Sequence, residues 1–413
     1  MISEKPRALL RKIHLYFAFS FGLIFVLLGL SGGIIAWMHE IDVWLNPQLL
    51  TLPTSSAASA HTGKSLSPTQ IQALVNMLSA HPRYGRPHQI QLAQHPELAC
   101  IASYRLKNSE QSSAFAQQFS TQITRQVMLN PYTLEVLGER RWGELGMSRP
   151  LLMSTLYHLH RYLLSGSFGK TVVGSAGLVL ILLCISGLIL WWPAMRWASM
   201  RQALTVSFRG SWPRLHYSLH RSSGFWVLPA FIVLGFSGMY FNLPQWVRPV
   251  IHHITPLTDT RAVSSMPNNL ATTAHSEVAL SQVIATVQAR FPEARLSRIG
   301  LPAQASETYE LRMRQETEVR QGDGNTRISV DAYSGEIVQI RDPLHANRGD
   351  TFLNWMFPLH TGEAFGLTGR IIISLLGLMP LLFMITGTAI WLKRQRKKTS
   401  KPRTPRRRNV EGF

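Results

Sequence analysis

The sequence predicts a membrane all-α four-helix bundle, built as a tandem repeat of one two-helix unit, with two small α+β modules exported between the helices. Three observations predict this fold class. Hydrophobic residues make up 46% of the 413-residue chain although its formal net charge is +20, so charged and apolar residues must be segregated along the chain. Four apolar runs are long enough to cross a bilayer. The two halves of the chain also resemble each other segment by segment.

The four apolar runs, of about 20 residues each, match the thickness of a bilayer core. Their interiors contain no Asp, Glu, Lys or Arg, whereas a buried helix of a soluble protein is more often shorter and carries a polar stripe. The first run is longer than the apolar region of a cleaved signal peptide, so we expect it to be retained. With their flanking residues, the expected membrane spans are 14–39, 158–192, 216–242 and 359–392.

Lysine and arginine are concentrated in three segments outside these spans, at 1–13, 193–215 and 393–413. Short cytoplasmic segments retain positive charge, so we expect these three segments, and both termini, in the cytoplasm. The long loops, 40–157 and 243–358, are near neutral, with 7 acids to 9 bases and 12 acids to 11 bases. We therefore expect the loops in the periplasm and the protein in the bacterial inner (cytoplasmic) membrane. Because this topology accounts for the basic composition, the expected partner is the lipid bilayer and not nucleic acid.

The apolar spans of the two halves repeat one another. LGLSG begins at Leu28 in the first span and LGFSG at Leu234 in the third, while SGL begins at Ser186 in the second and TGT at Thr386 in the fourth. Each span also carries a histidine near one end, and the four are His14, His160, His220 and His360. The two histidines of a half are 146 residues apart in the first half and 140 in the second.

The two long loops repeat as well, since each opens with a helical pattern and closes with a strand pair. The helix is expected at 70–78 in the first loop and at 282–291 in the second, and the strand pairs at 128–138 and 328–338. Apolar residues alternate around an Asn or Asp turn in each pair, which is typical of strands with a tight connection. Each loop is therefore expected to be a small α+β module.

With four histidine-led spans, two such modules and a basic tail, the chain resembles the PepSY-associated transmembrane family over almost its whole length, and its exported loops resemble PepSY domains. The individual motifs are short, but their order is duplicated across the chain. This resemblance implies a place in bacterial iron uptake, because members of the family have been described as di-haem ferric-siderophore reductases of the inner membrane.

The duplication also predicts how the histidines pair. Each half contributes two spans, so both halves insert in the same orientation and should be related by a pseudo-twofold axis along the membrane normal. His14 and His220 are then expected together at the cytoplasmic ends of their helices, and His160 and His360 at the exported ends. Neutral imidazole is a common axial ligand of haem iron. We therefore expect two b-type haems, each held by one histidine from either half.

Three other histidines compete with these four. His216 lies one helical turn before His220 on the same face, so it could replace His220 as a ligand or contact a haem propionate. His158 lies nearly opposite His160 on its helix and would need another partner. His39 has no counterpart in the third span. The sequence alone does not decide between His216 and His220.

These residues and the resemblance predict a haem-containing oxidoreductase that passes electrons across the membrane to a ferric siderophore and so releases ferrous iron for uptake. Reduction weakens the hold of hard oxygen ligands, which suit the ferric ion. No glycine-rich dinucleotide-binding motif follows a strand, so quinol or a cytoplasmic reductase is the expected electron donor. Two alternatives stay open. One is a haem-free, membrane-anchored PepSY module that binds proteins or peptides, and the other is a siderophore or iron transporter, which the lack of intramembrane acids disfavours.

Overall fold

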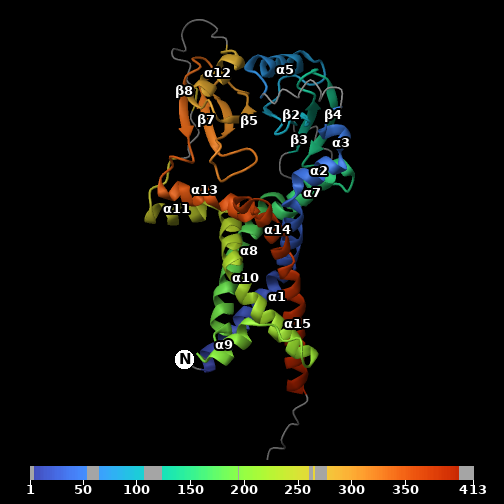
Figure 1. The fold of residues 1–413 in the computed structure, drawn as a ribbon, viewed down its shortest axis with the longest axis vertical. Coiled ribbons are helices and arrows are strands. Elements are labelled where there is room, and N and C mark those ends of the chain that lie inside the picture. The colour runs from blue at the N-terminus through green and yellow to red at the C-terminus, as the bar shows by residue number, and fades with distance from the viewer. Residues whose placement is uncertain are drawn as a thin grey trace, which may run out of the picture.

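The computed structural model describes residues 4–53, 65–106, 123–193, 195–259, 264–265 and 277–399. A head of strands and short helices stands on a bundle of long helices, and the amino terminus lies at the far end of this bundle (Figure 1). We call the two ends of the bundle the head end and the terminal end. The expected basic tail, 393–413, is included only to Thr399, so its residues 400–413 lie outside the described residues.

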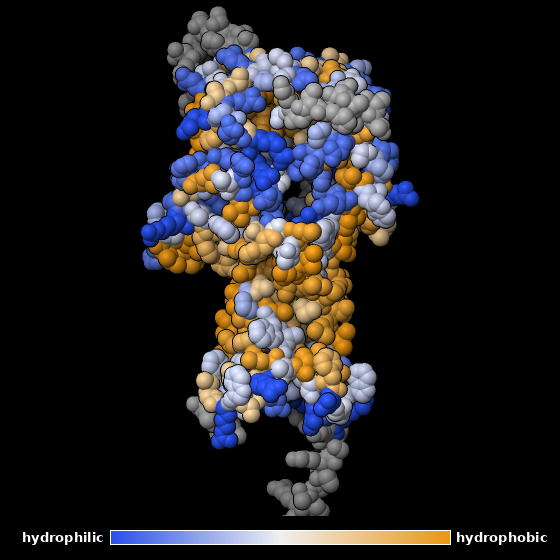
Figure 2. Space-filling view, viewed as in Figure 1, coloured by the Kyte–Doolittle hydropathy of each residue, from blue (hydrophilic) through white to orange (hydrophobic). Residues whose placement is uncertain are grey.

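Long apolar helices form the bundle, and these are α1 (Glu4–Ile35), α8 (Gly166–Trp191), α10 (Trp212–Asn242), and the consecutive α14 (Gly366–Leu376) and α15 (Met379–Thr399). In the described part of the chain they supply four segments that are long and apolar enough to cross a membrane. The bundle exposes apolar side chains such as Leu23, Ile185 and Leu375. Figure 2 shows it as an apolar shaft between two hydrophilic ends. A continuous apolar surface of this kind is unfavourable in water, so the chain is a membrane protein.

Shorter helices connect the bundle to the head or connect one long helix of the bundle to the next. They are α2 (Met38–Leu45), α3 (Pro47–Leu50), α7 (Arg149–Tyr162), α9 (Trp197–Leu204), α11 (Pro244–Ile254), α13 (Arg348–Thr361) and the 3-10 helix η2 (Glu363–Phe365).

In the expected span regions 158–192 and 359–392, the chain is broken just after the histidine. α7 ends two residues after His160, because Leu163 adopts a left-handed conformation with φ 47°. α13 ends one residue after His360, at Gly362 with φ 80°. A right-handed helix cannot continue through such residues. Both histidines therefore lie in the last turn of a short helix that precedes the membrane-crossing one.

The described part of the head contains one antiparallel sheet of eight strands, in the order β4-β3-β2-β1-β5-β6-β7-β8. The strands are β1 (Gln89–Gln91), β2 (Cys100–Arg105), β3 (Thr124–Leu129), β4 (Val136–Trp142), β5 (Arg295–Gly300), β6 (Tyr309–Arg314), β7 (Thr326–Val330) and β8 (Ile337–Arg341). The first four strands with α5 (Pro68–Ala80) form the first module, and the last four with α12 (Leu280–Arg290) form the second. Ile90 of β1 lies opposite Ile299 of β5, so the modules share one sheet.

A single apolar core runs through both modules, between the sheet and the helices α5 and α12. It includes the fully buried Leu78, Ile90, Ile284 and Ile299. α5 and α12 lie on the side of the sheet away from the bundle (Figure 1). Because successive residues of a strand point to opposite faces, the residues between the core positions form the face of the sheet that is turned toward the bundle.

The closing hairpin of each module is fixed by the same kind of turn. The side chain of Asn130 accepts hydrogen bonds from the backbone amides two and three residues further on, at 3.0 and 3.3 Å. Asp331 accepts the equivalent two bonds, each at 2.8 Å. Turns of this type favour Asn and Asp because their short side chains reach these amides. The β3–β4 and β7–β8 hairpins are therefore formed by local sequence.

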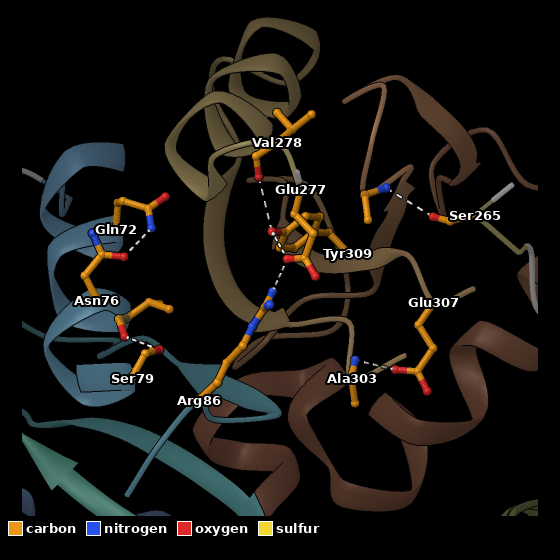
Figure 3. Close-up of polar contacts among 12 residues, drawn as sticks. Gln72, Asn76, Ser79, Arg86, Ser265, Glu277, Val278, Ala303, Glu307 and Tyr309 are labelled. Atoms are coloured by element: carbon orange, nitrogen blue, oxygen red, sulfur yellow. Dashed lines mark hydrogen bonds and ion pairs between the residues drawn. The ribbon is translucent and has the colours of Figure 1, made fainter. Parts of the chain in front are cut away.

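Polar contacts also join the two modules. Figure 3 shows Arg86 of the first module reaching Glu277 of the second, with 2.6 Å between Arg86 Nη2 and Glu277 Oε2. The Tyr309 hydroxyl donates to the same carboxylate at 3.3 Å, and the Ser281 amide donates to Gln72 Oε1 at 3.1 Å. The ion pair is half-exposed, and such pairs contribute at most about 1 kcal/mol. The shared sheet and core therefore hold the modules together.

Candidate functional site

Histidines form two pairs, one at each end of the bundle. At the head end, the ring centroids of His160 and His360 are 6.1 Å apart. At the terminal end, His14 on α1 lies near His220 on α10. The structure thus brings together the residues that the repeat paired in the sequence, one from each half of the chain.

Each of these four histidines directs its Nδ1 atom toward a hydroxyl oxygen on a neighbouring helix. The distances are 2.8 Å from His14 to Ser186, 2.9 Å from His220 to Thr386, 3.3 Å from His160 to Ser31 and 2.7 Å from His360 to Ser237. In every case the hydroxyl belongs to the same half of the chain as the histidine.

The hydroxyl groups act as acceptors in these contacts, because each donates its own hydrogen elsewhere. The backbone carbonyls that accept it are Leu183 for Ser186 (3.2 Å), Leu382 for Thr386 (2.7 Å), Leu27 for Ser31 (2.6 Å) and Val233 for Ser237 (2.6 Å). A hydroxyl carries one hydrogen, so the hydrogen between the two side chains must come from the histidine.

The protonated ring nitrogen is therefore Nδ1 in all four histidines. For His160 a second contact supports this, since its Nδ1 lies 3.0 Å from the carbonyl oxygen of Leu28, which can only accept. In a neutral imidazole the other nitrogen then holds a free lone pair. Nε2 is thus prepared to coordinate a metal, and the ring orientation is fixed by the hydrogen bond on its far side.

A glycine follows each of the four hydroxyl residues, and three of these glycines border a histidine ring. A Cβ at Gly187 would lie 3.5 Å from Cε1 of His14, and one at Gly387 would lie 3.6 Å from Cε1 of His220. At Gly32 a Cβ would approach Cε1 of His160 to 2.8 Å, which is too close, whereas Gly238 faces open space. These three glycines therefore let the imidazoles pack directly against the helix backbone.

Aromatic side chains complete the surroundings of both pairs. Phe241 packs edge-on against His360 with 5.4 Å between ring centroids, and Phe383 packs edge-on against His220 at 5.2 Å. These rings are part of the low-polarity environment between the helices. Within the residues that the structure covers, no three His, Cys, Asp or Glu side chains gather in a way that could hold a metal ion. The arrangement available at each end is a histidine pair.

The other predicted histidines lie differently. His216 stacks on Trp212 with 5.8 Å between centroids, and its buried Nδ1 has no hydrogen-bond partner among the described residues. His158 is buried, and its Nδ1 lies 2.7 Å from the Ser154 carbonyl oxygen. His39 is exposed. None of the three shows the contact to a hydroxyl that the paired histidines share.

The hydroxyl partners were missed in the sequence analysis. The serine and threonine of the duplicated motifs, at Ser31, Ser186, Ser237 and Thr386, were used only to recognise the repeat. Their constant place before a glycine, in a span neighbouring a histidine, was the available signal. The sequence does not predict how each helix is rotated about its axis, and this rotation decides whether the hydroxyl faces the histidine ring.

Comparison with known proteins adds one finding. A family model described as the PepSY-associated TM region matches residues 11–394, a range that includes all four paired histidines. A search of curated proteins found no match.

Proposed function

Since the chain belongs to the PepSY-associated transmembrane-region family, we propose that it is an inner-membrane haem-containing reductase. It passes electrons across the membrane to a ferric siderophore in the periplasm and so releases ferrous iron for uptake. In this proposal the two halves are a tandem duplication related by a pseudo-twofold axis, the head is a pair of PepSY-like modules in the periplasm, and the terminal end of the bundle faces the cytoplasm with both termini.

The observation that carries the proposal is the contact that the four paired histidines share, each with its Nδ1 against a hydroxyl oxygen of a neighbouring helix. His14 with His220, and His160 with His360, would each hold one b-type haem through two Nε2 atoms, and the hydroxyl on the far side of every ring would keep it oriented. A haem held in this way supplies reversible one-electron transfer between its ferric and ferrous states. The fit rests on the donor set, on the fixed Nδ1 protons and on the glycines beside the rings.

Two pairs at opposite ends of the bundle suit a transmembrane path for electrons. The described spans place apolar and aromatic side chains around both pairs, which keeps water away from the ligands. The donor at the terminal end would be quinol or a cytoplasmic reductase. At the head end, one electron converts a ferric chelate to the ferrous form, and hard oxygen ligands hold ferrous iron less tightly.

The test is the haem content of the purified full-length protein. We expect two haems per chain, with a visible spectrum that changes on reduction, and we expect acidified organic solvent to extract both because the sequence has no Cys-x-x-Cys-His attachment motif. A protein expressed with ample haem that purifies without pigment would contradict the proposal and leave the haem-free interaction module. Pigment that resists extraction would contradict the assignment of b-type haem.

A second expected outcome concerns Ser237, which accepts the Nδ1 hydrogen bond of His360. This bond makes the imidazole a stronger electron donor and so favours the ferric state. We expect Ser237→Ala to raise the midpoint potential of one haem while the other stays unchanged, and Ser237→Thr to restore the parent value. Redox titration of the visible bands measures both.

The matched control is Ser223→Ala, on the same helix, because Ser223 donates only to the backbone carbonyl of Leu219. It should leave both potentials unchanged. If Ser237→Ala and Ser223→Ala behave alike, the hydroxyl does not act on the histidine in the way proposed.

A further inference from the structure

A row of arginines crosses the second module on the face of the sheet that is turned toward the bundle. Arg298 of β5 lies opposite Arg312 of β6, Arg312 lies opposite Arg327 of β7, and Arg327 lies opposite Arg341 of β8. The residues beside them in the same strands, such as Ile299 and Leu311, enter the core instead. The four guanidinium groups are therefore placed side by side on one surface.

Such a row is unfavourable for the fold, because like charges directly opposite one another destabilise a sheet. Asp323 compensates one end, with its Oδ2 atom 2.5 Å from Arg298 Nη2 and 3.9 Å from Arg312 Nη1. No carboxylate of the described residues forms an ion pair with Arg327, whose side chain is exposed. Burial, together with the neighbouring positive charges, first that of Arg327, lowers the pKa of Arg312 to about 9.

The first module shows that the fold does not require these arginines. Its equivalent row is Gln89, Ser103, Gln126 and Arg140, on β1 to β4. The one arginine there is buried and lies 2.8 Å from the carboxylate of Asp42, so it is neutralised within the protein. Two modules of the same architecture thus differ in charge at the same positions, and the excess positive charge of the second module needs another explanation.

The row is accessible from a cavity and lies near the head-end histidines. The cavity has a volume of 1070 Å³, and its lining includes Arg327 and Arg341 from the sheet, Tyr240 from α10 and Asn354 from α13. Five acids also line it, and these are Asp259, Glu293, Glu316, Asp342 and Asp350. Four arginines line it too, Arg327 and Arg341 of the row together with Arg248 and Arg290, and these are the groups that an anion would contact.

A series of ring contacts leads from the surroundings of the arginine row to His360. The guanidinium of Arg320, which lies near Arg312 and Arg327, stacks over Phe357 at 4.0 Å from the ring centroid. Phe357 is 6.0 Å from Phe241, and Phe241 is 5.4 Å from His360. These successive contacts connect the surroundings of the arginine row to His360.

We propose that the arginine row binds the ferric chelate, and that the chain selects chelates carrying several negative charges on carboxylate or catecholate arms. A guanidinium group can donate two hydrogen bonds to such oxygens, and Arg327 and Arg341 of the row line the cavity. A neutral or cationic chelate, such as a trihydroxamate, gains nothing from the row. This inference rests on the proposed function and names the substrate class of the same reductase.

The experiment measures binding without reduction, using gallium(III) complexes because gallium(III) replaces ferric iron but is not reduced by haem. The probes are gallium tris(catecholate), a trianion, and a neutral gallium trihydroxamate, added to the full-length haem-loaded protein in detergent and followed by calorimetry. We expect the trianion to bind at least about 10-fold more tightly than the neutral complex. Arg327→Gln, which installs the residue found at the equivalent Gln126, should weaken binding of the trianion by about 10-fold or more.

Adding Arg312→Ser, which matches Ser103, should weaken it further, while the matched control Arg105→Gln, an exposed arginine on β2 of the first module, should change it less than about 2-fold. The thermal stability of Arg327→Gln should equal or exceed that of the parent, since a like-charge contact is removed. The proposal is overturned if Arg327→Gln binds the trianion as tightly as the parent does. It is also overturned if Arg327→Gln loses haem but keeps its affinity for the chelate, because the arginine row would then bind haem propionates. A parent protein without haem would instead refute the proposed function.

Discussion

We expect His14→Ala and His220→Ala to lose the same haem, the one at the terminal end. The head-end haem should keep its spectrum in both variants. His160→Ala and His360→Ala should show the opposite loss. The reason is that each pair combines one histidine from either half of the chain, and removal of one axial ligand would leave iron without its second imidazole. Haem content and a redox titration of each variant measure the effect, because the parent should show two waves.

His216→Ala is the matched control for the terminal-end pair, since His216 lies on the same helix as His220 and its Nδ1 lacks a hydrogen-bond partner within the described residues. Both waves should survive in it. Should His216→Ala lose the terminal-end haem while His220→Ala retains it, the ligand is His216. Loss of the same wave in His14→Ala and His360→Ala would refute the pairing between the two halves.

Reduction across a membrane should stop when either pair is broken. In proteoliposomes with reductant enclosed and a ferric chelate outside, we expect His14→Ala and His360→Ala to lower the rate by more than about 100-fold, because changes in groups that merely support a metal ligand already cost roughly 10–100-fold. If His14→Ala reduces the outside chelate at the parent rate, the head-end haem alone is sufficient. That result would exclude an electron path through both haems.

Removal of residues 399–413 is the control for this assay, because the basic tail should contact anionic lipid and not the electron path. The rate should stay close to that of the parent. Deleting residues 263–342 would test the second module less cleanly, because it removes β5 to β8 and leaves one edge of β1 unpaired. Single substitutions in the arginine row are the better test of the second module.

The sequence predicted those parts of the structure that depend on local pattern. The apolar runs predicted four membrane-crossing segments, and the alternating residues around Asn130 and Asp331 predicted the two closing hairpins, because the turn is made by the side chain of the turn residue itself. The four histidines were found because their positions recur in both halves. Each of these signals lies within a few residues of the feature that it predicts.

The rest depends on contacts between distant residues. Nothing near Gln91 indicates that it lies opposite Arg298, and the arginine row exists only through the register of four strands that are separated in the sequence. The left-handed conformation of Leu163, which ends α7 after His160, is not predicted by the residue itself, because leucine is unusual in that conformation. The tertiary packing around it, not its own preference, holds that conformation.

The hydrogen bonds between β1 and β5 also determine when the head can fold. Gln72 and Ser281, which meet across the junction of the modules, are 209 positions apart in the chain, and α8 and α10 lie between them. Until the second module has been synthesised, the edge of β1 that pairs with β5 stays unpaired, and such edges promote aggregation in folding intermediates. The first module is completed only after the third span has been inserted. Closure of the sheet therefore requires both halves of the chain, and a chain arrested before that point displays an unpaired strand edge.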